Sequence, residues 1–404
     1  MTTFLSAYKA LPAVAGRALL PVGFLARLPQ PMLQLGMVLL VTTSTGSLGY
    51  AGLAAGALSL GAAVGGPWVG RLADRRGQRV VMVVASLLNA AFAVAFVVEV
   101  ALDAPRWLAL VTAAATGAAT PQIGPLMRSR WVRLLRDRDR LSTAMSWEGA
   151  ADEIVYILGP VVVSLFTLIS PSLAMLAGAL MVAVFGVWAG LHPSAAAAGP
   201  TATHTVHAPV WREPAVASLL LVSLAIGSFF GGMQTAVTAV ATLSGAAASA
   251  GLLYAAMGVG SALTGLGTSA LPARFGLGDR LVTFTLWLVV AVVPLLWITA
   301  VPLVAVLLFV VGCGVGPALI TVYSLAERQV SPERTGVTMT LISAGSVIGY
   351  SIGSSLGGRL AQDDGPGAAF TVSLAAVGVA TVVAVARRWR GSAVREARRD
   401  PALR

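Results

Sequence analysis

The sequence predicts an all-α polytopic membrane protein whose twelve transmembrane helices form two six-helix bundles. Hydrophobic residues make up 57% of the 404-residue chain and charged residues only 11%, a balance that excludes a soluble globular protein. Apolar runs of about 20 residues recur along the chain, and this is the length that an α-helix needs to cross the hydrocarbon core of a bilayer. The short alternating segments of a transmembrane β-barrel are not found in the sequence.

The predicted spans follow one another closely except at the middle of the chain. Residues 192–213, rich in Ala, Pro and Thr, predict a flexible cytoplasmic linker. We therefore expect an N-terminal bundle over 1–191, a C-terminal bundle over 214–387 and a basic tail over 388–404. The twelve spans are predicted over 18–42, 47–70, 79–101, 106–128, 144–168, 171–191, 214–241, 247–271, 281–300, 302–325, 336–360 and 367–387.

The distribution of basic residues predicts the orientation of the chain. An even number of spans puts both termini on one side, and 24 of the 27 Lys and Arg residues fall on that side. Only Arg106 and Arg359 fall on the other side. The positive-inside rule then places both termini in the cytoplasm of a multi-pass protein, in a bacterial inner or plasma membrane. The basic excess reflects this topology and contact with the lipid bilayer, and we expect no nucleic-acid partner.

The two halves of the chain resemble each other in sequence. A shift of 199 residues aligns Ala51-Gly52-Leu53 with Ala250-Gly251-Leu252, and Arg75 with Arg274. Such internal duplication is typical of two-half transporters, whose substrate site lies between the halves near the middle of the membrane.

A charged stretch, GRLADRRGQR from Gly70 to Arg79, separates the second and third predicted spans. Gly70 and Gly77 predict close packing and a helix stop, and we expect a short turn at the membrane face. Asp74 is the lone acid among four arginines and is expected to pair with one of them or to cap a helix. The pattern G-x-L-A-D-R-x-G-x-R closely resembles the signature loop of the major facilitator superfamily. Its gate-motif residues are Gly70, Asp74, Arg75, Gly77 and Arg79.

This resemblance implies a two-bundle fold that works by alternating access. It also implies that Asp74 contacts the N-terminus of the eleventh helix, and that the arginines help to hold the cytoplasmic side closed. The second copy of the loop, over 271–276, has Ala273 in place of the acid.

The fifth predicted helix carries a further resemblance, to bacterial drug and natural-product efflux members of the superfamily. Gly159-Pro160, which follows the acidic residues of this helix, resembles the core of the fifth-helix packing motif of proton-driven drug antiporters. Val163 and Ser164 depart from the motif, which has glycines there. The fourth-helix arginine of such antiporters is replaced by Ala113.

Four ionisable residues lie well inside predicted spans, where a charge is costly and a functional role is the default expectation. Glu148, Asp152 and Tyr156 follow one another at i, i+4 and i+8 on the fifth helix. These three residues form one stripe. Arg27, Gln30 and Gln34, at i, i+3 and i+7, form a matching stripe on the first helix, with Arg27 at a depth similar to that of Asp152. The full candidate set for proton coupling or the substrate cavity is Arg27, Gln30, Gln34, Glu148, Asp152, Glu153 and Tyr156.

Two interpretations of these charges stay open. In the first, Arg27 neutralises one acid while a second acid takes up a proton in competition with cargo, as proton-coupled transport requires. In the second, the charges form a structural ion pair that joins helices one and five. Three acids exceed what one arginine neutralises, which favours the first interpretation.

The function predicted from the sequence is secondary active transport, with proton-coupled export of an amphiphilic small molecule. Mostly apolar helices suit such cargo better than a sugar, although a symporter or exporter of a polar metabolite is the alternative. A membrane receptor or enzyme is a remote third possibility, because no credible nucleophile or metal set is found. We expect no cofactor and no bound metal, a proton gradient as the energy source, and a monomer.

Overall fold

The computed structural model describes residues 11–12, 14, 16–135, 137–197, 213–268, 271–272, 275–329 and 332–399. Within these ranges it leaves out the side chains of 138, 139, 142, 146, 153, 197, 332–337, 340 and 390–399. The chain folds as two compact units, one of residues 1–204 with 245–255 and the other of residues 205–244 with 256–404. The predicted linker lies largely outside the described residues.

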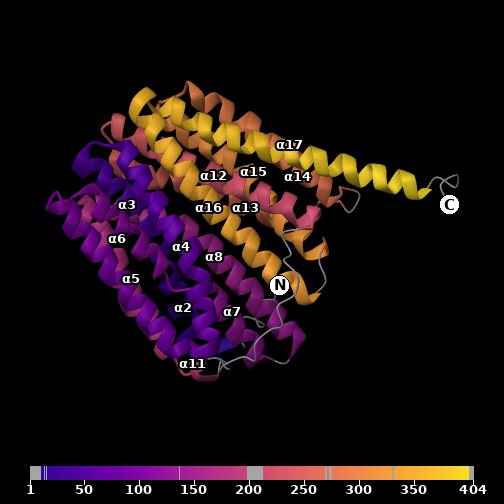
Figure 1. The fold of residues 1–404 in the computed structure, drawn as a ribbon, viewed down its shortest axis with the longest axis horizontal. Helices are drawn as coiled ribbons and strands as arrows, with labels where there is room; N and C mark the ends of the chain where they lie inside the picture. The colour runs from indigo at the N-terminus through magenta and orange to yellow at the C-terminus, as the bar shows by residue number, and fades with distance from the viewer. Residues whose placement is uncertain are drawn as a thin grey trace. The chain divides into compact units, whose positions relative to one another are not determined.

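Unit 1 is built from long helices with short connections (Figure 1). One π-helical turn, Val182–Gly186, joins α9 to α10 and packs its last residue against Ser86 of α5. The helices are α2 (Leu19–Arg27), α3 (Pro29–Thr45), α4 (Leu48–Arg76), α5 (Gln78–Ala101), α6 (Arg106–Ala118), α7 (Ile123–Leu134), α8 (Arg138–Thr167), α9 (Pro171–Met181), α10 (Val187–Leu191) and α11 (Ser194–Ala197).

Unit 2 is likewise helical, and α13 (Ala250–Gly267) crosses the boundary between the two units. No strand is present among the described residues of the chain. The other helices are α12 (Pro214–Leu243), α14 (Leu277–Val292), α15 (Val301–Gln329), α16 (Pro332–Asp364) and α17 (Pro366–Arg399), with short 3-10 turns at Ala247–Ser249 and Val293–Leu296.

Ten helical stretches within the described residues are long and apolar enough to cross a membrane, against twelve spans predicted from the sequence. The eleventh predicted span lies within the 33-residue helix α16. The fourth predicted span, 106–128, is not one helix, because α6 ends at Ala118 and α7 begins at Ile123. Pro121 explains this break, since it has no N–H to donate and disfavours helical geometry at the preceding residue.

The first predicted span is also divided, at Leu28 between α2 and α3. Pro29 and Pro31 follow directly and remove two backbone donors from the helix. Leu28 keeps helical dihedral angles, with φ −55° and ψ −35°, so the two helices still form one membrane-length stretch from Leu19 to Thr45. The division falls one residue after Arg27, so that this side chain lies on the last turn of α2.

The turn expected over Gly70 to Arg79 is shorter than predicted. Helix α4 continues to Arg76, and Gly77, at φ +88°, is the single residue between α4 and α5. This positive φ favours glycine, which agrees with the predicted helix stop. The close packing predicted at Gly70 is not observed among the described residues, because a Cβ placed there would meet none of their heavy atoms within 4 Å.

In unit 2, α12 and α16 approach each other closely along a series of glycines. A Cβ on Gly349 would lie 1.9 Å from the carbonyl oxygen of Leu224, and a Cβ on Gly353 would lie 2.0 Å from that of Ser228. Ser223 also donates a hydrogen bond of 2.7 Å to the carbonyl oxygen of Ile342. Small residues at four-residue spacing therefore allow the two helix backbones to touch.

Candidate functional site

The ionisable residues of α2 and α8 meet inside unit 1. Arg27 forms an ion pair with Glu148, and these side chains are only 5% and 3% exposed. The Nε atom of Arg27 also lies 3.2 Å from Oδ1 of Asp152, one turn further along α8. The contact with Asp152 is an ion pair without hydrogen-bond alignment, since Nε of Arg27 has no hydrogen-bond partner in the described structure.

Helix α7 contributes two further members that the sequence interpretation missed. Nε1 of Trp131, a fully buried residue, donates a hydrogen bond of 2.7 Å to Oε1 of Glu148. Arg128 forms an ion pair with Oδ2 of Asp152. From the sequence, Arg128 is only one of the 24 basic residues that predict the cytoplasmic side. Its i, i+3 spacing from Trp131, which puts both on one face of a helix, is the signal that identifies it.

The five side chains Arg27, Arg128, Trp131, Glu148 and Asp152 form what we call the charge cluster. Its described ionisable members are two arginines and two carboxylates, so the described part of the cluster carries no net charge when all four are ionised. The two acids differ in access to solvent, because Glu148 is 3% exposed whereas Asp152 is 33% exposed. Glu148 is therefore the buried partner of Arg27, and Asp152 is the more exposed of the two acids.

A second pair of polar side chains lies one turn further along the same two stripes. Nε2 of Gln30 donates a hydrogen bond of 3.3 Å to the hydroxyl oxygen of Tyr156, and both side chains are exposed. Gln34 turns away from α8, and its Nε2 lies 3.5 Å from Oγ of Ser59 on α4. The structure thus brings Arg27 and Gln30 to the α8 stripe, but not Gln34.

Other predicted site residues have separate positions. Glu153 lies on α8, but its side chain is outside the description of the structure. Gly159 packs against α3, since a Cβ there would lie 2.5 Å from Cγ of Pro31, and Pro160 continues inside α8. This packing places α8 against the helix that follows Arg27.

The gate motif has an exposed acid and exposed arginines. The side chains of Asp74, Arg75 and Arg79 are all exposed, and Asp74 makes no ion pair or hydrogen bond within the described part of the chain. The predicted pairing of Asp74 with an arginine of the loop is therefore not observed there. Its expected contact with the start of the eleventh helix falls on side chains 332–337, which lie outside the described residues.

Within the gate-motif stretch, between Gly77 and Arg79, Gln78 joins a buried polar network. Its Nε2 donates a hydrogen bond of 2.6 Å to Oγ of Ser129. Its Oε1 accepts a hydrogen bond of 2.7 Å from Nε of Arg130, which is fully buried. Nη1 of Arg130 donates hydrogen bonds to the carbonyl oxygen of Ala189, at 2.9 Å, and to Oγ of Ser194, at 3.3 Å. Burial lowers the pKa of Arg130 to about 10, while Glu148 opposes the shift, so Arg130 stays charged at neutral pH.

His192 extends this network at the end of α10, where its Nδ1 lies 2.9 Å from Oγ of Ser194. Burial lowers the pKa of His192, and the charge of Arg130 lowers it further. A lowered pKa in the folded state means that the unfolded state binds more protons, so this group stabilises the fold above about pH 6.5 and loses that effect as the pH falls. We expect the melting temperature to fall between about pH 7 and pH 5, and to fall less in His192→Gln. An equal fall in both proteins would contradict this assignment.

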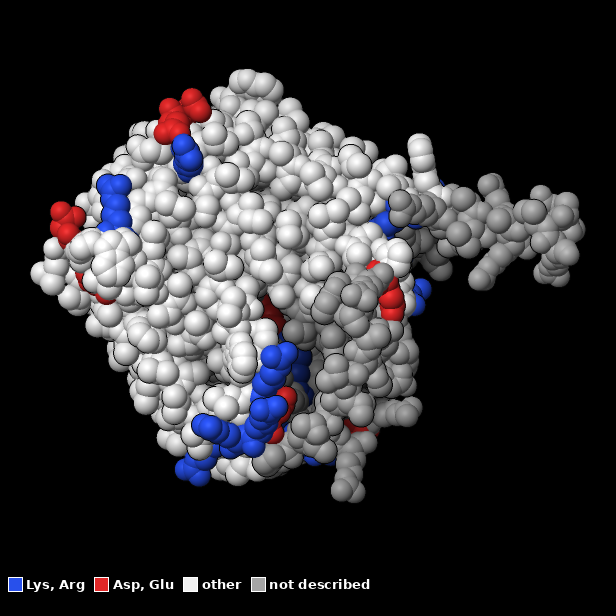
Figure 2. Space-filling model, in the orientation of Figure 1, with Lys and Arg blue, Asp and Glu red and all other residues white. Residues whose placement is uncertain are grey.

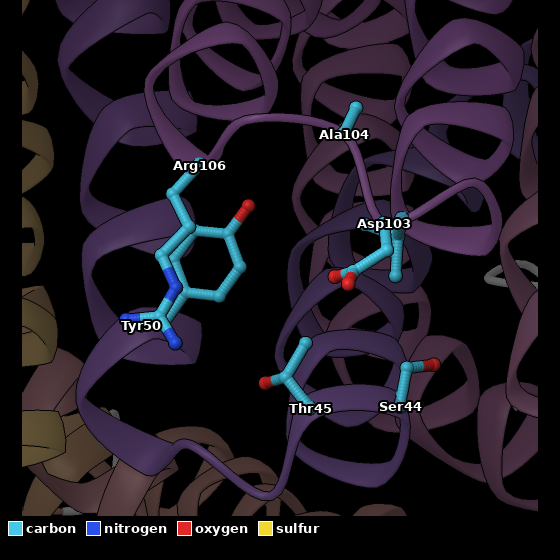
Figure 3. A pocket seen from close by; sticks show the side chains of 7 residues that line it. Ser44, Thr45, Tyr50, Asp103, Ala104 and Arg106 are labelled. Atoms are coloured by element: carbon cyan, nitrogen blue, oxygen red, sulfur yellow. The ribbon is translucent and has the colours of Figure 1, made fainter.

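A separate polar pocket of about 270 Å³ lies where α3 and α5 end and α4 and α6 begin (Figure 3). The guanidinium group of Arg106 lies 5.3 Å from the ring centre of Tyr50, and Asp103 points into the same pocket. Asp103 adopts φ +52°, a left-handed geometry that Asp tolerates better than most residues. Among the described residues no group of three His, Cys, Asp or Glu side chains is arranged to hold a metal ion.

Comparison with known proteins defines the class of this chain. The family model described as Major Facilitator Superfamily matches the chain over residues 19–342 and again over residues 241–402. The chain therefore belongs to the major facilitator superfamily, and it is a multi-pass membrane transporter rather than an enzyme. A search of curated protein sequences finds no match.

Solved structures share this fold at low sequence identity. A mutant of the nucleoside transporter NupG is similar at a TM-score of 0.72 and 15% identity, over 91% of this chain and 97% of that chain. A bacterial homologue of the iron transporter ferroportin in an inward-facing state is similar at a TM-score of 0.68 and 18% identity, over 91% of this chain and 97% of that chain. A POT family transporter in complex with a conjugated peptide is similar at a TM-score of 0.68 and 13% identity, over 93% of this chain and 96% of that chain.

Proposed function

We propose that this protein is a secondary active transporter that exports an amphiphilic small molecule in exchange for protons. The observation that carries the proposal is the charge cluster, in which a buried arginine contacts two acids of different accessibility. Ionisable groups inside a membrane protein are costly and are retained where protons, ions or substrates move. Membership of the superfamily supports the class of transporter, and the cluster supports the coupling to protons.

In the proposed cycle, Asp152 is the proton acceptor and Arg27 with Glu148 is the fixed pair beside it. A proton on Asp152 removes one negative charge from a cluster whose described charges otherwise balance, so the cluster becomes positive. The attraction that joins α7 to α8 through Arg128 is then weakened. Loss of the proton restores the ion pairs, so proton uptake and release favour two arrangements of α2, α7 and α8.

Tyr156 and Gln30 are the first cargo contacts in this proposal. Their amide and hydroxyl groups are exposed next to the cluster, and the residues of α8 that follow Glu153 are mostly apolar. An apolar surface with a few fixed polar groups suits an amphiphilic molecule. A polar metabolite is the second candidate, because the structural relatives include a nucleoside transporter and a peptide-bound transporter. We further propose a monomer in a bacterial inner membrane with both termini in the cytoplasm, as the distribution of basic residues indicates.

Asp152→Asn tests the coupling. In vesicles reconstituted with the purified protein, cargo added outside should release protons from the wild type, and this release should fall by at least tenfold in Asp152→Asn. Asparagine keeps the size of the side chain but does not take up a proton in this range. Glu153→Gln should be measured beside it, since Glu153 is the nearest alternative carrier.

The matched control is Asp137→Asn, because Asp137 is an exposed acid that pairs with Arg140 at i, i+3 outside the cluster. It should release protons like the wild type. Cargo for this assay comes from a compound panel scored for growth inhibition of a deletion strain. Proton release unchanged in both Asp152→Asn and Glu153→Gln would overturn the coupling assignment.

A further inference from the structure

A groove on unit 1 has the shape and chemistry of a lipid site. It encloses about 400 Å³ between α4, α5 and α6. Its floor is made of small residues, Ala85 on α5 with Ala115 and Ala118 of α6 and Ala119 directly after that helix. Larger apolar side chains, from Val69 and Leu72 on α4 and from Val80 to Phe92 on α5, form its walls.

The floor of the groove is rigid because α4 and α6 touch through their backbones. A Cβ on Gly61 would lie 1.9 Å from the carbonyl oxygen of Ala114, and a Cβ on Gly65 would lie 2.2 Å from that of Ala118. A Cβ on Gly117 would lie 1.8 Å from the carbonyl oxygen of Leu58. Helices in such direct contact cannot close further to fill the groove, so its depth is a fixed feature of the fold.

The walls remain open along one side of α5. Val80 is 58% exposed, Val84 48% and Leu88 46%. In a membrane-spanning helix these apolar residues face the bilayer, so an acyl chain is the molecule that is available to cover them.

The length and charge of the groove select the kind of lipid. From Val80 to Phe92 it extends twelve residues along α5, or about 18 Å. One leaflet contributes about 15 Å of hydrocarbon, half of the roughly 30 Å core. Arg76 lines the groove at its α4 end, and Arg79 is exposed on the first turn of α5 beside it. A chain in the groove would therefore place an anionic headgroup at these arginines.

Basic side chains mark this end of unit 1 more widely. On the face shown in Figure 2, the blue side chains gather mainly at the lower end, where Figure 1 labels α7 and α11. The positive-inside rule assigns this end to the cytoplasmic leaflet.

We propose that this groove binds one anionic phospholipid of the cytoplasmic leaflet, with an acyl chain between α4, α5 and α6 and its phosphate at Arg76. The site lies one residue before Gly77, where α4 ends and the gate motif turns into α5. A lipid held there joins the two helices on either side of that turn. This inference is independent of the cargo and of the proton coupling proposed above.

Native mass spectrometry of the full-length protein tests the site, with phosphatidylglycerol compared with phosphatidylcholine of the same acyl chains. The wild type should bind the anionic lipid more tightly, and Arg76→Gln should reduce that preference by roughly fivefold, the effect of one basic residue near an anionic headgroup. Ala115→Leu, which fills the floor of the groove, should weaken binding of both lipids.

The matched control is Arg71→Gln. Arg71 is exposed on the same end of α4 but lies over the ring of Trp68, 5.8 Å from its centre, and does not line the groove. It should keep the wild-type preference. Equal binding of the two lipids by the wild type, or an equal loss in Arg71→Gln and Arg76→Gln, would overturn the proposal. If Ala115→Leu does not purify as a monodisperse protein, Leu88→Trp, at an exposed position on the wall of the groove, replaces it. Unchanged lipid binding in that variant would contradict the proposal that an acyl chain lies in the groove.

Discussion

Glu148→Gln should destabilise unit 1 by about 3 kcal/mol and lower transport to near background. The substitution leaves Arg27 buried, at 5% exposure, with its main ion-pair partner removed. It also replaces a charged acceptor by a neutral one for Nε1 of Trp131. Oδ1 of Asp152 lies 3.2 Å from Nε of Arg27, but the same carboxylate also pairs with Arg128. Asp152 therefore compensates only in part for the lost charge of Glu148. Thermal unfolding in detergent measures the stability.

A double substitution separates a buried charge from a lost function. Arg27→Met with Glu148→Leu removes both charges together. The double variant should be more stable than either single variant, because each single variant leaves one buried charge without its partner and the double variant does not. It should nevertheless remain inactive if the pair takes part in transport. A double variant that is less stable than both single variants would contradict the account of this pair, and an active one would limit the pair to a structural role.

Gly349→Ala should destabilise unit 2 by about 3 kcal/mol or more. The added Cβ would lie 1.9 Å from the carbonyl oxygen of Leu224 and 2.9 Å from the backbone nitrogen of Ser228. Carbon and carbonyl oxygen atoms in close helix contacts are about 3.3–3.6 Å apart, so α12 and α16 must separate by more than ~1 Å. The Ser223 hydroxyl would then lose its hydrogen bond to Ile342, which joins the same two helices. Thermal unfolding of the purified variant measures the loss.

The control for this prediction is Gly378→Ala on α17. A Cβ at Gly378 would meet no heavy atom of the described residues within 4 Å, so the substitution should only improve helix propensity. It should leave the melting temperature unchanged or raise it slightly, by the equivalent of about 0.5–1 kcal/mol. Equal melting temperatures for the two variants would show that the close approach of α12 and α16 is not as described.

The sequence predicted the two stripes of the candidate site because the helical period alone defines them. Arg27 and Gln30 lie on one helix face, and Asp152 and Tyr156 on another, whatever the rest of the fold does. Their partners depend on packing between helices. The sequence interpretation counted three acids against one arginine, and the structure adds Arg128 from α7, so the charge imbalance that favoured a proton carrier is absent among the described side chains.

The missed contacts trace to the proline break in the fourth span. The apolar helix ends early, before Pro121, and Arg128 and Trp131 lie on a second helix, α7. A continuous helix over 106–128 would have put Arg128 at its cytoplasmic end. Gly70 fails for a different reason, because a glycine in a motif predicts close packing only where a neighbouring backbone is present. On α16, by contrast, Gly349 and Gly353 lie on one helix face at four-residue spacing, and the backbone of α12 is next to both of them.

Two transport modes of one variant test most directly whether Asp152 couples protons to cargo through the charge cluster. Reconstituted Asp152→Asn should still exchange labelled for unlabelled cargo when the pH is equal on both sides, because the proposed cargo contacts at Gln30 and Tyr156 are unchanged. It should no longer accumulate cargo against a concentration difference when a pH gradient is imposed. Accumulation at the wild-type level in this variant would contradict the claim.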